Sequence, residues 1–191
     1  MENMTALITG AGSGIGFGVA SRLIVEGAKV VIADIDVEKG NQAQTSLGEN
    51  ARFQKCDVTN ESEVKALVEF AVSEFGGLDI MHNNAGAFGA RGSILEMDAD
   101  GIDKTYALLV KSVVLGMKHA GLAMKEKGGT IINTASISAT KPGYGPHLYQ
   151  GAKAAVRQLT KSVSLELAQY QIRVNCISPG GVYTPLIGNA F

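Results

Sequence analysis

The sequence has few or none of several patterns that mark common classes of protein. It contains only two cysteines, Cys56 and Cys176, and each falls in a predicted strand, so we expect buried thiols rather than a disulfide or a metal site. No cluster of lysine and arginine stands out and the formal net charge is −1, which argues against a nucleic-acid partner. No apolar run reaches the ~18 residues that a membrane span needs, and the N-terminal residues lack the pattern of a secretory signal. These absences predict a cytoplasmic protein with no membrane or nucleic-acid partner.

What the sequence does contain fits one globular domain. Its 191 residues suffice for a single domain with a substantial core, and the hydrophobic fraction of 46% is ordinary for a globular protein. Glycine is abundant, with 24 residues, which suits a backbone that must approach a ligand closely. No linker, repeat or low-complexity segment divides the chain, so we expect residues 1–191 to form one domain.

Apolar runs alternate with helical patterns along the whole chain. Strands are predicted at 4–9, 29–33, 51–56, 78–83, 130–135 and 173–177. Helices are predicted at 14–27, 37–47, from a cap at Thr59 or Asn60 to Phe75, at 99–125 and at 147–169. This order predicts an α/β fold, a Rossmann-like doubly wound parallel sheet with helices on both faces. Ligands bind at the carboxyl ends of such strands, and the long loop 84–97 follows one of them, so we expect this loop to be functional.

The stretch Thr9–Gly16 links the first strand to the first helix and reads T-G-x-x-x-G-x-G. In this position the backbone N–H groups of the turn and of the helix N-terminus favour a pyrophosphate. A side chain at Gly10, Gly14 or Gly16 would obstruct the turn, the approach of the phosphate or the packing of helix on strand. The pattern therefore predicts a dinucleotide site, and a glycine-rich turn without a ligand is the alternative.

Asp34 ends the second strand, 18 residues after Gly16. A carboxylate there can accept hydrogen bonds from the adenosine ribose hydroxyls and would repel a 2′-phosphate. Ser13 is neutral at a place where a protein that binds the 2′-phosphate would benefit from a cation. Both features favour NAD over NADP. The alternative role of Asp34, capping the next helix, can be filled by Asp36 instead.

Three further residues are candidates for proton transfer. Tyr149 and Lys153 lie four residues apart near the start of a predicted helix, so they share a face. A free tyrosine has a pKa near ~10, and a nearby ammonium would lower that pKa by stabilising the phenolate. The pair could then exchange a proton with an alcohol or a carbonyl, while Ser136, at the end of a strand, could donate a hydrogen bond to the same oxygen. A Tyr and Lys pair by itself is also common on helix surfaces.

These residues, together with several others, closely resemble the short-chain dehydrogenase/reductase superfamily. The resemblance covers essentially the whole chain in order and rests on Thr9–Gly16, Asp57-Val58, Asn83–Gly86, Ser136, Tyr149–Lys153 and Pro179–Thr184. It implies an NAD-dependent oxidoreductase that transfers a hydride between nicotinamide and a small-molecule secondary alcohol or ketone. Residues 145–149 and the region of the last strand are similar to members that oxidise cyclic, terpenoid, steroid or lignan-like alcohols.

The resemblance also implies a role for each matching residue. Tyr149 is the expected acid/base, Lys153 would lower its pKa and hold the nicotinamide ribose, and Ser136 would orient the substrate oxygen. The expected cofactor contacts, from the turn and the resemblance together, are Gly10, Ser13, Gly14, Ile15, Gly16, Asp34, Asp57, Val58, Asn84, Ala85, Gly86, Tyr149, Lys153, Pro179, Gly180, Val182 and Thr184. Ser138 and Tyr144 are the expected substrate contacts, and no metal site is expected.

The chain departs from the family pattern in two places. Leu109 lies 27 residues before Ser136, where many members have an asparagine that holds a water linking the lysine to solvent. A leucine cannot hold that water, which puts the relay of protons in doubt. Members also usually continue beyond the equivalent of Phe191, so we expect the C-terminal lid and last strand to be missing from this sequence.

Two consequences of the resemblance concern function and assembly. Leu109 leaves open a second class of function, an NAD-binding pseudoenzyme or scaffold with weakened catalysis, although Ser136, Tyr149 and Lys153 are intact. Members commonly pair the helices predicted here at 99–125 and 147–169 across a two-fold axis. The resemblance therefore implies a homodimer or homotetramer.

Overall fold

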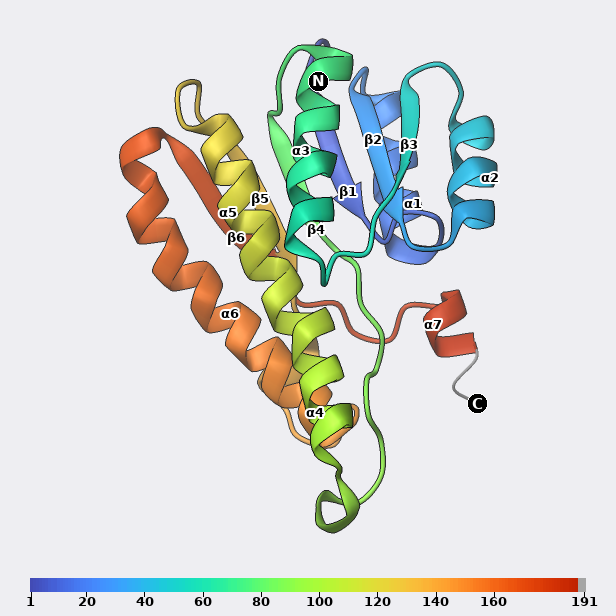
Figure 1. The fold of residues 1–191 in the computed structure, drawn as a ribbon, viewed down its shortest axis with the longest axis vertical. Coiled ribbons are helices and arrows are strands. Elements are labelled where there is room, and N and C mark those ends of the chain that lie inside the picture. The colour runs from blue at the N-terminus through green and yellow to red at the C-terminus, as the bar shows by residue number, and fades with distance from the viewer. Residues whose placement is uncertain (189–191) are drawn as a thin grey trace.

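Six parallel strands form the central layer of the protein in this computed structural model, which describes residues 1–188. The strands are β1 (Thr5–Thr9), β2 (Lys29–Asp34), β3 (Ala51–Lys55), β4 (Ile80–Asn83), β5 (Gly129–Thr134) and β6 (Ile172–Ile177). Their order in the sheet is β3-β2-β1-β4-β5-β6, so the chain winds outward from β1 to one edge and then from β4 to the other (Figure 1). The predicted doubly wound parallel sheet is confirmed.

Helices cover both faces of this sheet. On one face lie α1 (Gly14–Val25) and α2 (Val37–Leu47), and on the other lie α3 (Glu61–Phe75), α5 (Ser112–Met124) and α6 (His147–Leu167). The remaining elements are α4 (Ala99–Tyr106), the π-helical turn η2 (Ala107–Lys111), the 3₁₀ helices η1 (Ile94–Glu96), η3 (Ile137–Ala139) and η4 (Ala168–Tyr170), and α7 (Pro185–Gly188).

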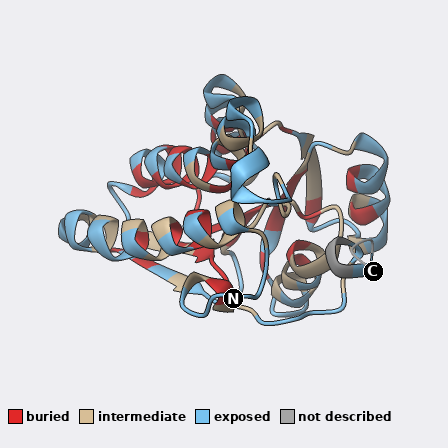
Figure 2. Ribbon diagram, turned by 90° about the horizontal axis from the view of Figure 1, so that it is seen from below, coloured by how far each residue is buried: buried red, intermediate tan, exposed pale blue. Residues whose placement is uncertain are grey.

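The core has two halves because successive strand residues point to opposite faces. In β1, Leu7 packs in the half formed with α3, α5 and α6, whereas Ala6 and Ile8 pack in the half formed with α1 and α2. Figure 2 shows the buried residues along the strands and on the inner faces of the helices. This double burial explains why the strands read as continuous apolar runs.

Most element boundaries agree with the sequence-based ones within two residues. The strand expected at 78–83 begins at Ile80. Asp79, just before it, is joined to β1 by its backbone N, which donates to Thr5 O at 2.9 Å, and by its carboxylate, which accepts from Thr5 N at 2.7 Å. The helix expected at 99–125 is not one continuous α-helix, since η2 separates α4 from α5. Such π-turns often occur at functional sites.

Side-chain caps fix the starts of two helices. Asp36 Oδ1 accepts a hydrogen bond from Lys39 N at the start of α2, which leaves Asp34 free for another role, as predicted. Asn60 Oδ1 accepts one from Ser62 N at the start of α3, so Asn60 rather than Thr59 is the cap there.

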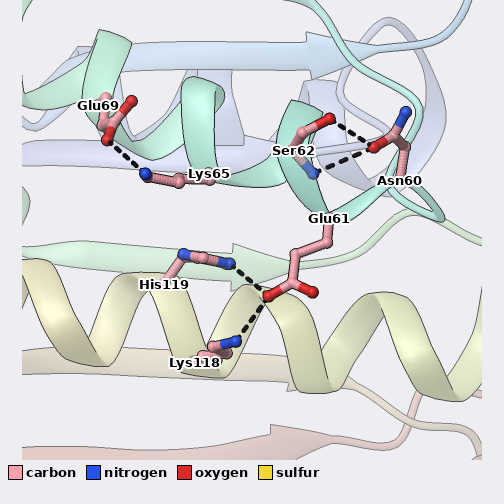
Figure 3. Close-up of polar contacts among 7 residues, drawn as sticks. All are labelled: Asn60, Glu61, Ser62, Lys65, Glu69, Lys118 and His119. Carbon is pink, nitrogen blue, oxygen red and sulfur yellow. Dashed lines mark hydrogen bonds and ion pairs between the residues drawn. The ribbon is translucent and has the colours of Figure 1, made fainter.

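Glu61, the first residue of α3, ties this helix to α5 (Figure 3). Its Oε1 accepts a hydrogen bond from Lys118 Nζ at 2.6 Å and lies 3.2 Å from His119 Nε2. The Lys118 amine lowers the pKa of the Glu61 carboxyl below its usual value. The contact is exposed, so it adds little to stability.

The helical stretch Ala99–Met124 is long and apolar enough to cross a membrane by length and composition alone. Within its most apolar window, however, 56% of the residues are buried inside the fold. Packing on the sheet accounts for this apolar character, as it does for other core helices.

Candidate active site

A cleft of about 780 Å³ opens at the carboxyl ends of the strands, beside the point between β1 and β4 where the strand order reverses. Open α/β sheets bind their ligands at this point, and the volume suits a cofactor with a small substrate. Most of the residues singled out in the sequence line it: Gly10, Ser13, Gly14, Ile15, Asp34, Asp57, Val58, Asn84, Ala85, Gly86, Ser136, Tyr144, Tyr149, Lys153, Pro179, Gly180, Val182 and Thr184. Gly16 and Ser138 are the two that do not.

The glycine-rich turn is held tightly between β1 and the segment after β4. Gly10 has φ +63°, and a Cβ there would lie 2.7 Å from Ala85 Cα. A Cβ on Gly16 would overlap the carbonyl oxygen of Gly10, so Gly16 serves the packing of α1 on the turn rather than the cleft wall. Asn84 Nδ2 donates hydrogen bonds to the carbonyl oxygens of Thr9 and Gly10, at 3.0 and 3.1 Å. The Asn84 side chain therefore shapes the turn.

The first turn of α1 faces the cleft without a side-chain cap, because Ser13 makes no capping hydrogen bond. Gly14 and Ile15, the first residues of this helix, line the cleft beside it. A Cβ on Gly14, which has φ +57°, would lie 3.4 Å from the Thr184 side chain, so the segment after β6 closes over the turn. Figure 1 shows this segment crossing the carboxyl ends of the strands toward α7. Uncapped N–H groups and the helix dipole favour an anion at this end of the cleft.

Acidic and thiol groups lie at the ends of β2 and β3. Asp34 Oδ2 accepts a hydrogen bond from Gly12 N at 2.9 Å and Oδ1 accepts one from Asp36 N at 3.0 Å, so the carboxylate is fixed at the edge of the turn. Cys56 also lines the cleft, but burial raises the pKa of its thiol to about 12. The thiol therefore carries little thiolate, the form that acts as a nucleophile, at neutral pH. Both cysteines are free thiols, but only Cys56 is buried as expected; Cys176 in β6 is half-buried.

The proton-transfer candidates come together at the other end of the cleft. Tyr149 and Lys153 lie in the first turns of α6, and Ser136 follows β5 at the start of η3. Lys153 is only 4% exposed; its Nζ donates a 2.6 Å hydrogen bond to the carbonyl oxygen of Thr134 and lies 5.6 Å from the centre of the Tyr149 ring. Burial lowers the pKa of this lysine to about 8.

The pKa of Tyr149 differs in direction from the expectation. Burial raises it above its usual value, and the interaction with the Ser136 hydroxyl opposes this only in part. The Lys153 ammonium does not reverse the shift; its Nζ lies over the ring, 5.6 Å from the centre, and donates its hydrogen bond to the Thr134 carbonyl. The expected lowering of this pKa by Lys153 is therefore wrong.

Ser138 acts on Ser136 rather than on the cleft. It is buried, and its Oγ and backbone N donate hydrogen bonds to Ser136 Oγ at 2.9 and 3.2 Å. With two hydrogen bonds accepted, the Ser136 hydroxyl is left to donate its proton toward the cleft. Tyr144, the other expected substrate contact, is 61% exposed and lines the cleft mouth.

Leu109 lies in the middle of η2 and is fully buried. Gly86 lies between Leu109 and Lys153, since a Cβ on Gly86 would be 3.2 Å from Leu109 Cδ2 and 3.8 Å from Lys153 Nζ. Ser112 Oγ donates a hydrogen bond to the carbonyl oxygen of Leu108 in the same turn. The buried Leu109 thus places hydrocarbon against Gly86, which also lies close to Lys153.

The sequence analysis missed several residues of the cleft wall. They are Ile35, Cys56, Ala87, Phe88, Leu108, Thr134, Ala135, Ile137, Gly145, Gly181 and Pro185. Two of them, Ala87 and Phe88, belong to the loop 84–97. The length of this loop predicted a functional role for it, but it did not identify Phe88 as a cleft residue.

Comparison with known proteins supports a common origin for the whole cleft. A model of the short chain dehydrogenase family matches residues 4–191. The sex determination protein tasselseed-2 of Zea mays is 41% identical over 100% of this chain, and (+)-borneol dehydrogenase 2 of Salvia officinalis is 44% identical over 95% of it. The chain spans 59% and 65% of the lengths of these two relatives.

A solved structure agrees closely with the fold. The crystal structure of 3-ketoacyl-(acyl-carrier-protein) reductase from Brucella melitensis complexed with NADH has a TM-score of 0.94 and 35% sequence identity to this chain. The match covers 98% of this chain and 79% of that one.

Proposed function

The chain belongs to the short chain dehydrogenase family, and on that basis we propose that it is an oxidoreductase that transfers a hydride between NAD and a secondary alcohol or ketone. One observation carries the proposal: Ser136, Tyr149 and Lys153 share a cleft with an uncapped helix N-terminus and a glycine turn. A proton-transfer group and an anion site in one cleft support redox chemistry on an alcohol with a dinucleotide.

The residues of the turn fit a dinucleotide. A Cβ on Gly10 or Gly14 would meet Ala85 or Thr184, and α1 begins at Gly14 without a side-chain cap. We assign the pyrophosphate to this turn, the adenosine ribose to Asp34, and the nicotinamide end to Lys153, Val182 and Thr184. Bound NAD supplies the hydride acceptor for the carbinol carbon.

In this proposal the chain's own residues handle the substrate oxygen and its proton. Ser136, whose oxygen already accepts two hydrogen bonds from Ser138, donates its proton to the substrate oxygen. Tyr149 accepts the alcohol proton as the carbinol hydrogen leaves, and returns a proton in the reverse reaction. Lys153, fixed by its hydrogen bond to the Thr134 carbonyl, is assigned to the nicotinamide ribose.

Asp34 supports NAD as the preferred form of the cofactor. Its carboxylate is fixed by Gly12 N and Asp36 N at the edge of the turn, where a 2′-phosphate would meet its negative charge. Lys39, the cation nearby, forms an ion pair with Asp36 at 2.9 Å. We therefore expect NAD to bind more tightly than NADP, and calorimetry with both forms tests this.

We also propose that the protein forms a homodimer or homotetramer. Val114 and Leu122 of α5 and Leu165 of α6 are exposed apolar side chains on the two helices expected to pair. The cytoplasmic location remains a prediction. A non-catalytic scaffold has no specific observation in its favour, because Leu109 is accommodated in the packing beneath an intact set of Ser136, Tyr149 and Lys153.

The test is NADH formation from NAD and a panel of cyclic secondary alcohols. Tyr149→Phe, which removes only the hydroxyl, should lower kcat by about 10²–10⁴-fold while NAD binding measured by calorimetry stays unchanged. Tyr170→Phe in η4, at the far end of α6, is the matched control and keeps full activity. Turnover that survives Tyr149→Phe would refute the proposed chemistry.

A further inference from the structure

The loop after β4 places the ring of Phe88 against the ring of Tyr149. The two ring centres are 5.3 Å apart and the planes are tilted by 57°, a favourable aromatic contact. Arg91 Cζ lies 5.1 Å from the centre of the Phe88 ring, so a guanidinium also packs on it. Phe88 lines the same cleft as Tyr149. Two neighbours thus restrain an aromatic ring directly beside the proposed acid/base.

Thr105 fastens the loop to α4 immediately after Phe88. Gly89 has φ +68°, and a Cβ there would lie within 2.6 Å of Thr105 Oγ1, so loop and helix are in close contact. Ala90 N donates a 2.9 Å hydrogen bond to Thr105 Oγ1, which in turn donates to the carbonyl oxygen of Gly101 at 2.7 Å. Thr105 is only 2% exposed. Its hydroxyl therefore holds the backbone that carries Phe88, while the loop beyond, at 91–96, is exposed.

The cleft around Phe88 is apolar. Leu108, Ile137 and Tyr144 line it with Phe88, and the charged residues of the described lining are Asp34 and Asp57 at the adenosine end and the buried Lys153. A substrate that reaches Tyr149 consequently meets hydrocarbon and aromatic surface, which disfavours a charged group near the reacting carbon.

We propose that Phe88 is a specificity-determining residue that selects rigid cyclic alcohols and ketones, with Thr105 as its positioning residue. The proposal rests on the proposed function, since it concerns the substrate of the same site. Phe88, held against the Tyr149 ring, presents an apolar face to the cleft where the carbons next to the carbinol carbon lie. A closed ring can cover that face without losing internal rotations, whereas an open chain must freeze several bonds to do so.

Cycloheptanol and dipropyl carbinol, which have the same number of carbons, test this directly with NAD as the acceptor. We expect the wild-type protein to favour cycloheptanol by at least about 10-fold in kcat/KM, in the range that apolar pocket contacts provide. Phe88→Ala should reduce this preference to within about 3-fold, mostly through KM for the cyclic alcohol. Phe88→Tyr, which keeps the ring, should retain the preference.

Thr105 gives a second route to the same result without touching the cleft. Thr105→Val removes the hydroxyl that holds Ala90 N and should weaken the preference for the cyclic alcohol, whereas Thr105→Ser keeps that hydroxyl and should preserve the preference. If Phe88→Ala slows both alcohols equally, the residue only supports Tyr149 and the proposal is wrong. If the wild type oxidises neither alcohol, the proposed function fails as well.

Discussion

Replacing Lys153 with methionine should stabilise the protein at neutral pH while abolishing its activity. The lysine is only 4% exposed, and within the part of the chain that the structure describes it forms no ion pair with a carboxylate. Burial lowers its pKa from 10.5 to about 8, which corresponds to about 3 kcal/mol of unfolding free energy lost when the charged form is buried. Methionine has a similar length and no charge, but it gives up the hydrogen bond to Thr134, worth about 1 kcal/mol.

The pH dependence fixes the sign of this effect. At pH 7 the lysine is protonated in both the folded and unfolded states, so the full penalty is present. Between about pH 8 and 10.5 the unfolded chain binds more protons than the folded protein, so the free energy of unfolding of the wild type rises with pH. By about pH 10.5 it has regained the free energy lost by burying the charge. Lys153→Met should therefore be more stable than wild type by about 2 kcal/mol at pH 7, and about 1 kcal/mol less stable above pH 10.5.

Urea unfolding at a series of pH values measures this difference. Circular dichroism is the suitable signal, because the chain has no tryptophan. Lys127→Met, at an exposed lysine in the turn after α5, is the control and should stay within about 0.5 kcal/mol of wild type at every pH. A Lys153→Met protein that is less stable than wild type at pH 7, or a difference that does not change with pH, would refute the reasoning.

Three further predictions concern catalysis and packing. Because burial raises the pKa of Tyr149 and lowers that of Lys153 to about 8, kcat/KM for alcohol oxidation should rise between about pH 6 and 8, before Lys153 loses its proton, and that for ketone reduction should fall; flat pH–rate profiles would contradict this assignment. Leu109→Asn should raise kcat for NADH formation by restoring a polar group near Lys153. Because the site is fully buried, it should also lower the free energy of unfolding by about 2–4 kcal/mol. An unchanged or lower kcat would rule out a role for this position in proton relay. Gly116→Ala should destabilise the protein by about 2 kcal/mol or more in urea, since a Cβ there would overlap Asn83 Oδ1. The control Gly121→Ala, in the same helix, would meet only Leu167 at 3.4 Å and should be neutral. Equal effects of the two substitutions would show that the contact with Asn83 relaxes freely.

The sequence-based prediction failed where long-range packing overrides a local pattern. The apolar run at 99–125 has the periodicity of one helix, but its middle forms the π-turn η2 around the buried Leu109, where it packs against α6. The spacing of Tyr149 and Lys153 correctly predicted that they share a helix face. It could not show that the Lys153 ammonium bonds to the Thr134 carbonyl and does not lower the pKa of Tyr149. That outcome depends on burial and on a strand from elsewhere in the chain.

The amino-acid sequence by itself determined the order of strands and helices, the glycine turn and the freedom of Asp34 from capping. Each of these depends on residues within a few positions of one another: apolar runs buried on both faces, small residues at a tight turn, and Asp36 capping α2. Only the tertiary structure decided which side chain faces Tyr149. Phe88 reaches that ring because Thr105, 17 residues further along the chain, binds the loop to α4, and α6 brings Tyr149 to the same cleft. Contacts between segments this far apart depend on the packed fold, which local patterns in the sequence do not encode.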